Sequence, residues 1–170
     1  MNAEWLKLSV MWYFLWTRNF LIVTSEIGMP KGLPNQDWVT KWKADVLAIS
    51  PKMISYEIEV KMTLEDLRRD KRKFRKHQEY HSKNYSPHYF YYAIPKGLEN
   101  KAIIDKPYGI MTVDPKILGN VRVFQKACHL PGTGLPDDFL KHICRRICAE
   151  NIDLREKIYR EKGKMEAYGI

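Results

Sequence analysis

Two acids and a lysine lie where catalytic side chains would be expected, inside short apolar runs that are typical of β-strands. Asp45 is in the run 44–49, and Glu59 and Lys61 are in the run 54–61. Burying a carboxylate in an apolar sheet costs several kcal/mol unless a cation or hydrogen bonds compensate for it. A divalent metal held between Asp45 and Glu59, with Lys61 beside it, is the simplest compensation. This arrangement is expected of metal-dependent phosphodiester cleavage.

The alternation of side chains along a strand suggests a role for each residue. Glu57, Glu59 and Lys61 are two residues apart, so their side chains point to one face of the sheet. Carboxylate oxygens suit Mg²⁺ or Mn²⁺, and the backbone carbonyl of Val60 is a candidate third ligand. Lys61 would orient or deprotonate a water, or stabilise the charge that builds on phosphorus. The alternative is an ordinary solvated ion pair between Glu59 and Lys61.

A third acid, Glu26, ends the first predicted strand. It is a candidate metal ligand that approaches from the far side or holds a second ion, and the alternative is a strand-end glutamate in solvent. Glu57 is a weaker candidate, as a group that supports the metal ligands or faces DNA.

The charge of the chain favours a polyanionic partner, and DNA is the first candidate. The formal net charge is +9, and residues 68–77 form a basic run on a predicted helix that borders the site. A helix of this kind would follow a phosphate backbone, whereas the alternative is an ordinary solvated helix face. The candidate DNA-binding residues are Lys41, Lys43, Arg68, Arg69, Lys71, Arg72, Lys73, Arg75 and Lys76.

Composition predicts one folded domain in a reducing compartment. A chain of 170 residues with 45% hydrophobic residues can bury a core. Three cysteines are too few for a disulfide scaffold, so a cytoplasmic location is expected. The apolar stretch 5–23 is interrupted by Lys7 and Arg18, which argues against a membrane span, and it lacks the marks of a signal peptide.

Periodicity predicts a helix over 3–17, with Trp5, Leu8, Trp12, Leu15 and Trp16 as its apolar face. A long loop is expected over 28–40, where glycine and proline recur. Thr63 is a predicted N-cap for a helix that runs to about His81. The predicted strands are 21–27, 42–49, 54–61, 88–94, 109–113 and 121–127, and a last helix begins near Pro136.

The pattern Asp45…Glu59-Val60-Lys61, on this order of elements, resembles the PD-(D/E)XK nuclease superfamily. The runs 25–26 and 43–48, the segment 66–71 and the aromatic strand 89–95 resemble, more specifically, the MmcB-like DNA-repair endonucleases. The similarity covers roughly residues 20–130. The resemblance implies that Asp45 and Glu59 bind magnesium or manganese and that Lys61 is the catalytic lysine. Glu26 matches the upstream acid of the family.

The expected fold class is therefore α/β, with a restriction-endonuclease-like core of helix, three-strand meander, helix and strand. The sheet would be mixed and flanked by helices, in a single domain over 1–150 with a charged helical tail over 151–170. The expected activity is metal-dependent cleavage of DNA, as an endonuclease in DNA repair or processing, and a homodimer is one assembly to consider. Two alternatives remain. One is a non-catalytic nucleic-acid-binding module, and the other is an interaction protein that docks through exposed N-terminal tryptophans.

Overall fold

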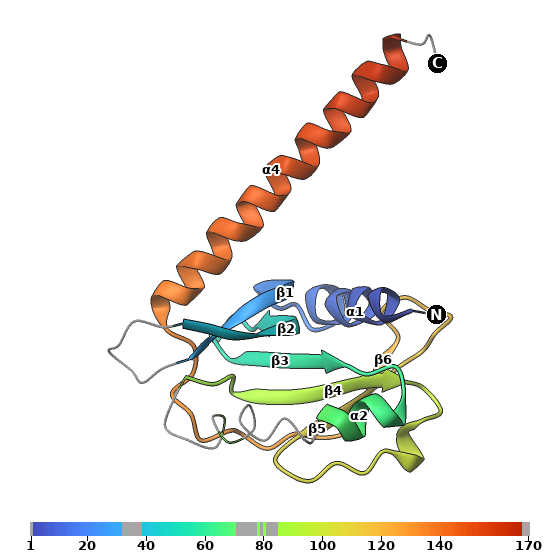
Figure 1. The fold of residues 1–170 in the computed structure, drawn as a ribbon, viewed down its shortest axis with the longest axis vertical. Helices are drawn as coiled ribbons and strands as arrows, with labels where there is room; N and C mark the ends of the chain where they lie inside the picture. Colours follow the sequence, from blue (N-terminus) through green and yellow to red (C-terminus); the bar gives the residue numbers. More distant parts are fainter. Residues whose placement is uncertain (1, 32–38, 71–77, 79, 81–84, 168–170) are drawn as a thin grey trace. The chain divides into compact units, whose positions relative to one another are not determined.

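The computed structural model describes residues 2–31, 39–70, 78, 80 and 85–167, with backbone alone at 30, 31, 39–41 and 162–167. The chain is a mixed α/β protein, and Figure 1 shows its sheet and helices. Its helices are α1 (Ala3–Trp12), which continues as a π-helix (Tyr13–Thr17), α2 (Leu64–Asp70), a 3₁₀ turn (Glu99–Lys101) and α4 (Asp137–Ala167). Its strands are β1 (Ile22–Lys31), β2 (Val39–Ile49), β3 (Ser55–Val60), β4 (Tyr89–Pro95), β5 (Gly109–Val113) and β6 (Val121–Gln125).

The six strands form one mixed sheet in the order β1-β2-β3-β4-β5-β6. The first three strands are an antiparallel meander, β4 lies parallel to β3, and β5 lies parallel to β4. The segment between β3 and β4 contains α2, as a crossover between parallel strands requires. The predicted meander, the parallel fourth strand and the mixed sheet are therefore confirmed.

The β1–β2 hairpin is longer than the sequence suggested, and the expected loop over 28–40 is wrong at both ends. β1 continues to Lys31, and β2 begins at Val39. The pairing shifts register between Gly28 and Pro30. A bulge of this kind accommodates a glycine and a proline near the edge of a sheet, so these residues do not end the strand.

Each face of the sheet buries its own core. On the face covered by α1, Val46, Ile58 and Val60 pack with residues of β4 and β5. On the other face, Leu67 of α2 and Tyr80 pack on aromatic residues of β4. The hydroxyl of Thr63 accepts a hydrogen bond from the backbone N–H of Asp66 at 3.1 Å, as the predicted N-cap requires. Most of the predicted helix beyond Asp70 lies outside the described residues.

The predicted apolar face of α1 is wrong. Leu6, Val10, Tyr13 and Phe14 are buried against the sheet, whereas Leu8, Trp12, Leu15 and Trp16 are exposed. Both sets have the same i, i+4, i+7, i+8 spacing, so periodicity alone does not choose between them. The choice depends on which set fits the surface of the sheet. The exposed set provides the apolar patch that the docking alternative requires.

The chain divides into two compact units, Met1–Pro136 and Asp137–Ile170. The second unit consists of α4, a helix that continues without a break past residue 150, where the sequence analysis placed a boundary. Within the described ranges, we find no helix that combines the length and the apolar character needed to cross a bilayer.

Candidate active site

The three candidate acids lie in one row across β1, β2 and β3. Ser25 pairs with Val46 and Ile27 with Ala44, which places Glu26 opposite Asp45. The pairing of β2 with β3 ends at Val46 and Ile58, so Asp45 and Glu59 are the first residues beyond the paired region. Register therefore brings Glu26 opposite Asp45, and Glu59 lies near enough for its charge to act on Asp45, although the three acids are far apart in the sequence.

Asp45 marks the point where β2 and β3 separate. The regular pairing of these strands ends at Val46 and Ile58, and the Asp45 carboxylate then accepts a hydrogen bond from the backbone N–H of Val60 at 2.8 Å. The N–H and C=O of one residue in a strand point to the same side. The carbonyl of Val60, the predicted third ligand, therefore also points toward β2.

Lys61 lies between two buried carboxylates just beyond the end of β3. Its ammonium is 3.1 Å from Glu59 Oε2 and 3.0 Å from Asp70 Oδ1. The second oxygen of Asp70 accepts a hydrogen bond from the Tyr92 hydroxyl at 3.0 Å. The side chains of Glu59 and Asp70 are only 6% and 1% exposed, so these ion pairs are shielded from solvent.

A second lysine enters the acidic row from α1. Lys7 pairs with Glu26 and with Glu4, and its ammonium is 3.9 Å from Asp45 Oδ1. The side chain of Lys7 is 13% exposed, whereas that of Glu26 is 43% exposed. Lys7 therefore occupies the space between the first and second acids, as Lys61 does between Glu59 and Asp70.

The environment of Asp45 opposes its ionisation. Burial and the neighbouring charge of Glu59 raise the pKa of Asp45 above its ordinary value, against the opposing effects of the Val60 N–H, Lys7 and Lys61. Burial by itself lowers the pKa of Lys61, but the charges of Glu59 and Asp70 outweigh burial and raise it. Lys61 is therefore charged at neutral pH, and Asp45 is the group in the row for which a further cation would be favourable.

Glu57 belongs to a separate buried network on the same face. The Tyr80 hydroxyl donates to Glu57, and the indole N–H of Trp42 donates to that hydroxyl at 2.8 Å. Glu57 is fully buried. Burial and the nearby Glu57 raise the pKa of Tyr80, so the phenol remains neutral. Glu57 is therefore held inside the protein by Tyr80 and does not face solvent. The expectation that it could face DNA is wrong.

The backbone is strained at Glu26. Its φ of 52° lies in the left-handed region that non-glycine residues seldom adopt, and it occurs in the middle of β1. A residue held in this way costs about 1–3 kcal/mol, and such residues cluster at functional sites.

The described candidates for DNA binding are exposed. Lys43, Arg68 and Arg69 lie at the surface, and Arg69 is paired with Glu65 one helical turn away. The side chain of Lys41 and residues Lys71, Arg72, Lys73, Arg75 and Lys76 lie outside the described part of the chain.

The donor chemistry of the row fits a hard divalent cation. Asp45 and Glu59 contribute carboxylate oxygens, and Val60 contributes a carbonyl directed toward β2. In the described residues, no three His, Cys, Asp or Glu side chains are grouped closely enough to hold a metal as they stand. The ammonium groups of Lys7 and Lys61 bridge the acids instead.

Sequence reasoning missed three residues that shape this site. Lys7 was noted only as a charge that interrupts the apolar stretch 5–23, and no local pattern links it to Glu26. Asp70 was noticed only within the segment 66–71 and the basic run 68–77, and Tyr92 only as part of an aromatic strand. The available signal was an acid in the first turns of the helix that follows β3, because the start of a crossover helix lies next to the end of the strand that it leaves.

We compared the chain with known proteins. No family model matches it, and no curated protein matches it. Among solved structures it resembles a protein of unknown function from Silicibacter pomeroyi, with a TM-score of 0.62 and 15% sequence identity over 96% of this chain and 94% of the other. This likeness shows the fold alone.

Proposed function

We propose that the chain is a metal-dependent DNA nuclease with a restriction-endonuclease-like core. The observation that carries the proposal is that Asp45 and Glu59 come together just beyond the last paired residues of β2 and β3, near enough for the charge of Glu59 to act on Asp45, with Lys61 next to Glu59. Like charges held together in a partly buried position are disfavoured without a cation, and functional sites are where such arrangements recur.

Asp45, Glu59 and the carbonyl of Val60 would hold Mg²⁺ or Mn²⁺, and Glu26 would complete the row from β1. The cation would supply Lewis acidity toward a phosphoryl oxygen and a lowered pKa for a water. Its charge would also offset the repulsion that raises the pKa of Asp45. Lys7 would have to release Asp45 and Glu26 for this to happen.

Lys61 acts as a fixed cation in this proposal. Its raised pKa argues against the role of a base that removes a proton from water, because the ammonium remains protonated at neutral pH. Asp70 holds it from the side opposite Glu59. The ammonium therefore stabilises the negative charge that develops on the phosphate, without any cost of reorientation during the reaction.

The partner is DNA because the chain is basic and the site has an exposed basic border. The formal net charge is +9, and Lys43 and Arg68 are exposed on β2 and α2, the elements that carry or flank the row. An endonuclease in DNA repair or processing is the activity that best combines this charge with the resemblance to MmcB-like proteins.

Cleavage assays on a panel of single-stranded, duplex and branched DNA with Mg²⁺ or Mn²⁺ test the proposal. We expect cleavage by the wild type and a loss of about 100-fold or more in Asp45→Asn and Lys61→Gln. Asp114→Asn and Lys96→Gln are matched controls, because that acid and lysine pair at 3.3 Å elsewhere on the surface. Equal activity in the site variants and the controls would overturn the proposal.

The second candidate is a nucleic-acid-binding module without catalysis. The observation that favours it is the pair of ammonium groups already bridging the acids, which neutralises part of their charge without a metal. Calorimetry separates the two functions. Salt-dependent DNA binding with no heat of Mg²⁺ or Mn²⁺ binding supports the module, whereas metal binding that Asp45→Asn abolishes supports the nuclease.

A further inference from the structure

A pocket lies on the sheet face covered by α1, and the proposed cleavage does not involve it. The pocket has a volume of about 600 Å³, within the range of small-molecule sites. Its lining includes Tyr56 of β3 and Tyr91 of β4. Side chains alternate between the two faces along a strand, so Tyr56 and Glu59 of β3 point to opposite faces, as do Tyr91 and Tyr92 of β4. The pocket therefore opens on the face of the sheet opposite to the Glu59 side chain.

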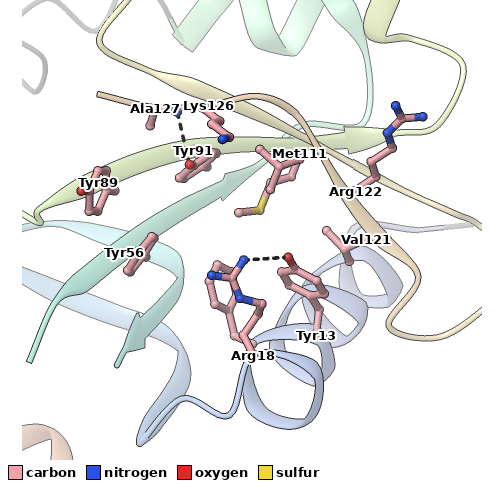
Figure 2. Close-up of a pocket in the computed structure, with 12 residues that line it drawn as sticks. Tyr13, Arg18, Tyr56, Tyr89, Tyr91, Met111, Val121, Arg122, Lys126 and Ala127 are labelled. Carbon is pink, nitrogen blue, oxygen red and sulfur yellow. Dashed lines mark hydrogen bonds between the residues drawn. The ribbon is translucent and has the colours of Figure 1, made fainter. Parts of the chain in front are cut away.

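Three tyrosines form an aromatic wall along one side of this pocket (Figure 2). The rings of Tyr56 and Tyr89 are stacked, with centroids 4.9 Å apart and planes at 25°. Tyr91 continues the array at 6.4 Å from Tyr56, with planes at 18°. Tyrosine rings that line a pocket give a planar aromatic ligand surfaces against which it can stack.

The floor of the pocket is apolar, and its border is cationic. Met111 and Val121 line the floor, and Arg18, Arg122 and Lys126 carry positive charge at the border. Arg18 donates to the Tyr13 hydroxyl at 3.3 Å, which leaves other guanidinium donors for a ligand. No acid is among the lining residues, and none of these three cations has a carboxylate partner among the described residues.

Aromatic stacking and uncompensated positive charge together select a ligand that is both planar and anionic. We propose that this pocket binds a nucleotide, with its base on the Tyr56–Tyr89–Tyr91 wall and its phosphate at Arg18 and Lys126. The nucleotide is either free or the terminal residue of a nucleic-acid strand, since both present the same base and phosphate. The inference goes beyond the proposed cleavage and does not depend on it.

The test uses the full chain labelled with ¹³C at its methionine methyl groups. Met111 lies in the pocket, whereas Met53 lies in an exposed turn and serves as an internal reference. Titration with deoxyadenosine 5′-monophosphate in EDTA should shift the Met111 resonance and leave Met53 unchanged. Deoxyadenosine and inorganic phosphate, which each lack half of the proposed contacts, should bind about tenfold or more weakly.

Two double variants with the same loss of charge locate the phosphate. Arg18→Gln with Lys126→Gln should weaken nucleotide binding about tenfold or more, whereas Lys52→Gln with Lys116→Gln, both exposed and outside the pocket, should change it less than twofold. Tyr89→Leu should weaken it as well, because it removes part of the stacking wall.

A 5′-phosphorylated hexanucleotide distinguishes the two sources of the ligand. Affinity at least tenfold tighter than that of the mononucleotide assigns the pocket to a strand end, and equal or weaker affinity assigns it to a free nucleotide. The absence of a Met111 shift with either probe, or equal effects of the two double variants, would overturn the proposal. Asp45→Asn should leave this binding intact, so failure here is separable from failure of the proposed nuclease activity.

Discussion

Asp45 shows how a single residue can oppose the stability of the fold that holds it. Burial and the charge of Glu59 raise its pKa, so its ionised form is less favourable in the folded chain than in the unfolded chain. The folded state therefore binds more protons than the unfolded state between the ordinary pKa of an aspartate and the raised one. Stability falls as the pH rises through that window.

The raised pKa of Asp45 leads to a prediction for Asp45→Asn. The amide oxygen can still accept the Val60 N–H, and the repulsion from Glu59 disappears. We expect the variant to be as stable as the wild type or more stable at pH 7 in EDTA, although it is inactive. Urea unfolding at pH 4 to 8 measures this, and the fall in stability over the Asp45 window should disappear.

Asp114→Asn is the control with the opposite sign. A hydrogen bond from the Lys116 N–H and the charge of Lys96 lower the pKa of Asp114, so its ionised form favours the folded state. Neutralising it should not raise stability at pH 7. If Asp45→Asn is clearly less stable than the wild type under these conditions, the electrostatic account of the row is wrong.

Asp70 is a positioning residue in this account, because it acts through Lys61. Asp70→Asn retains an oxygen for Lys61 but removes the charge that helps to raise the lysine pKa. We expect cleavage to fall about 10–100-fold, as for residues that orient a catalytic group. The alkaline limb of the pH–rate profile should also move to lower pH, which a purely structural defect would not cause.

Tyr92→Phe is the matched control for Asp70→Asn. It removes the hydrogen bond to the other oxygen of Asp70 but leaves the charge next to Lys61 in place. Its pH–rate profile should keep the wild-type alkaline limb. Identical shifts in both variants would argue against a charge effect of Asp70 on Lys61.

At the scale of elements, the point where β2 and β3 separate creates the site. Regular pairing ends at Val46 and Ile58, and the Asp45 carboxylate replaces the backbone partner that Val60 would otherwise have. Strands that separate leave peptide groups and side chains free to face a common point. Asp45 is therefore both a structural cap for β3 and a member of the acidic row.

The strained backbone at Glu26 of β1 leads to a prediction about stability. Glu26→Gly and Glu26→Ala both remove the ion pair with Lys7, but only glycine adopts a φ of 52° without a steric penalty. We expect the glycine variant to be about 1 kcal/mol more stable than the alanine variant in urea unfolding. Equal stability would show that β1 does not hold this conformation in solution.

The sequence predicted the elements better than the faces they present. Alternation and β-branched residues identified all six strands, because these signals are local. The buried face of α1 was predicted wrongly, because residues 6–16 contain two apolar sets with the same spacing, one beginning at Leu6 and the other at Leu8. Gly28 and Pro30 suggested a loop, but pairing with β2 keeps them in the strand. In both cases a contact with a distant segment, and not the local sequence, decided the conformation or the buried face.

At the scale of the whole molecule, the net charge of +9 governs encounter with a polyanion. A chain that neutralises several phosphates releases the same number of counterions, so its affinity for DNA falls steeply with salt. The acidic row would repel DNA on its own, and the surrounding basic residues must outweigh it.

We therefore predict a salt dependence that responds to Arg68 and Arg69, both exposed on α2. In EDTA, Arg68→Gln with Arg69→Gln should reduce the slope of log K against log [salt] by about 2, because two phosphate contacts are lost. Lys52→Gln with Lys116→Gln removes the same charge outside the site and should change the slope much less. Equal changes would mean that net charge alone, and not this border, binds DNA.

Composition and local pattern were enough to identify the candidate residues and the strands on which they lie. Asp45, Glu59 and Lys61 could be selected because a strand places alternate side chains on one face, a rule that needs no knowledge of the fold. Basic charge and the absence of a disulfide pattern followed from composition alone. Local periodicity and composition carry this information because they do not depend on distant contacts.

Tertiary structure alone decided what surrounds those residues. Lys7 meets Glu26 across 19 positions, Asp70 reaches Lys61 through the turn into α2, and Tyr92 reaches Asp70 through the crossover. The tyrosine wall likewise needs the pairing of β3 with β4. Contacts between distant segments depend on how the elements pack, and the energies of charged groups depend on burial. Neither these contacts nor these energies can be predicted from a local stretch of the sequence.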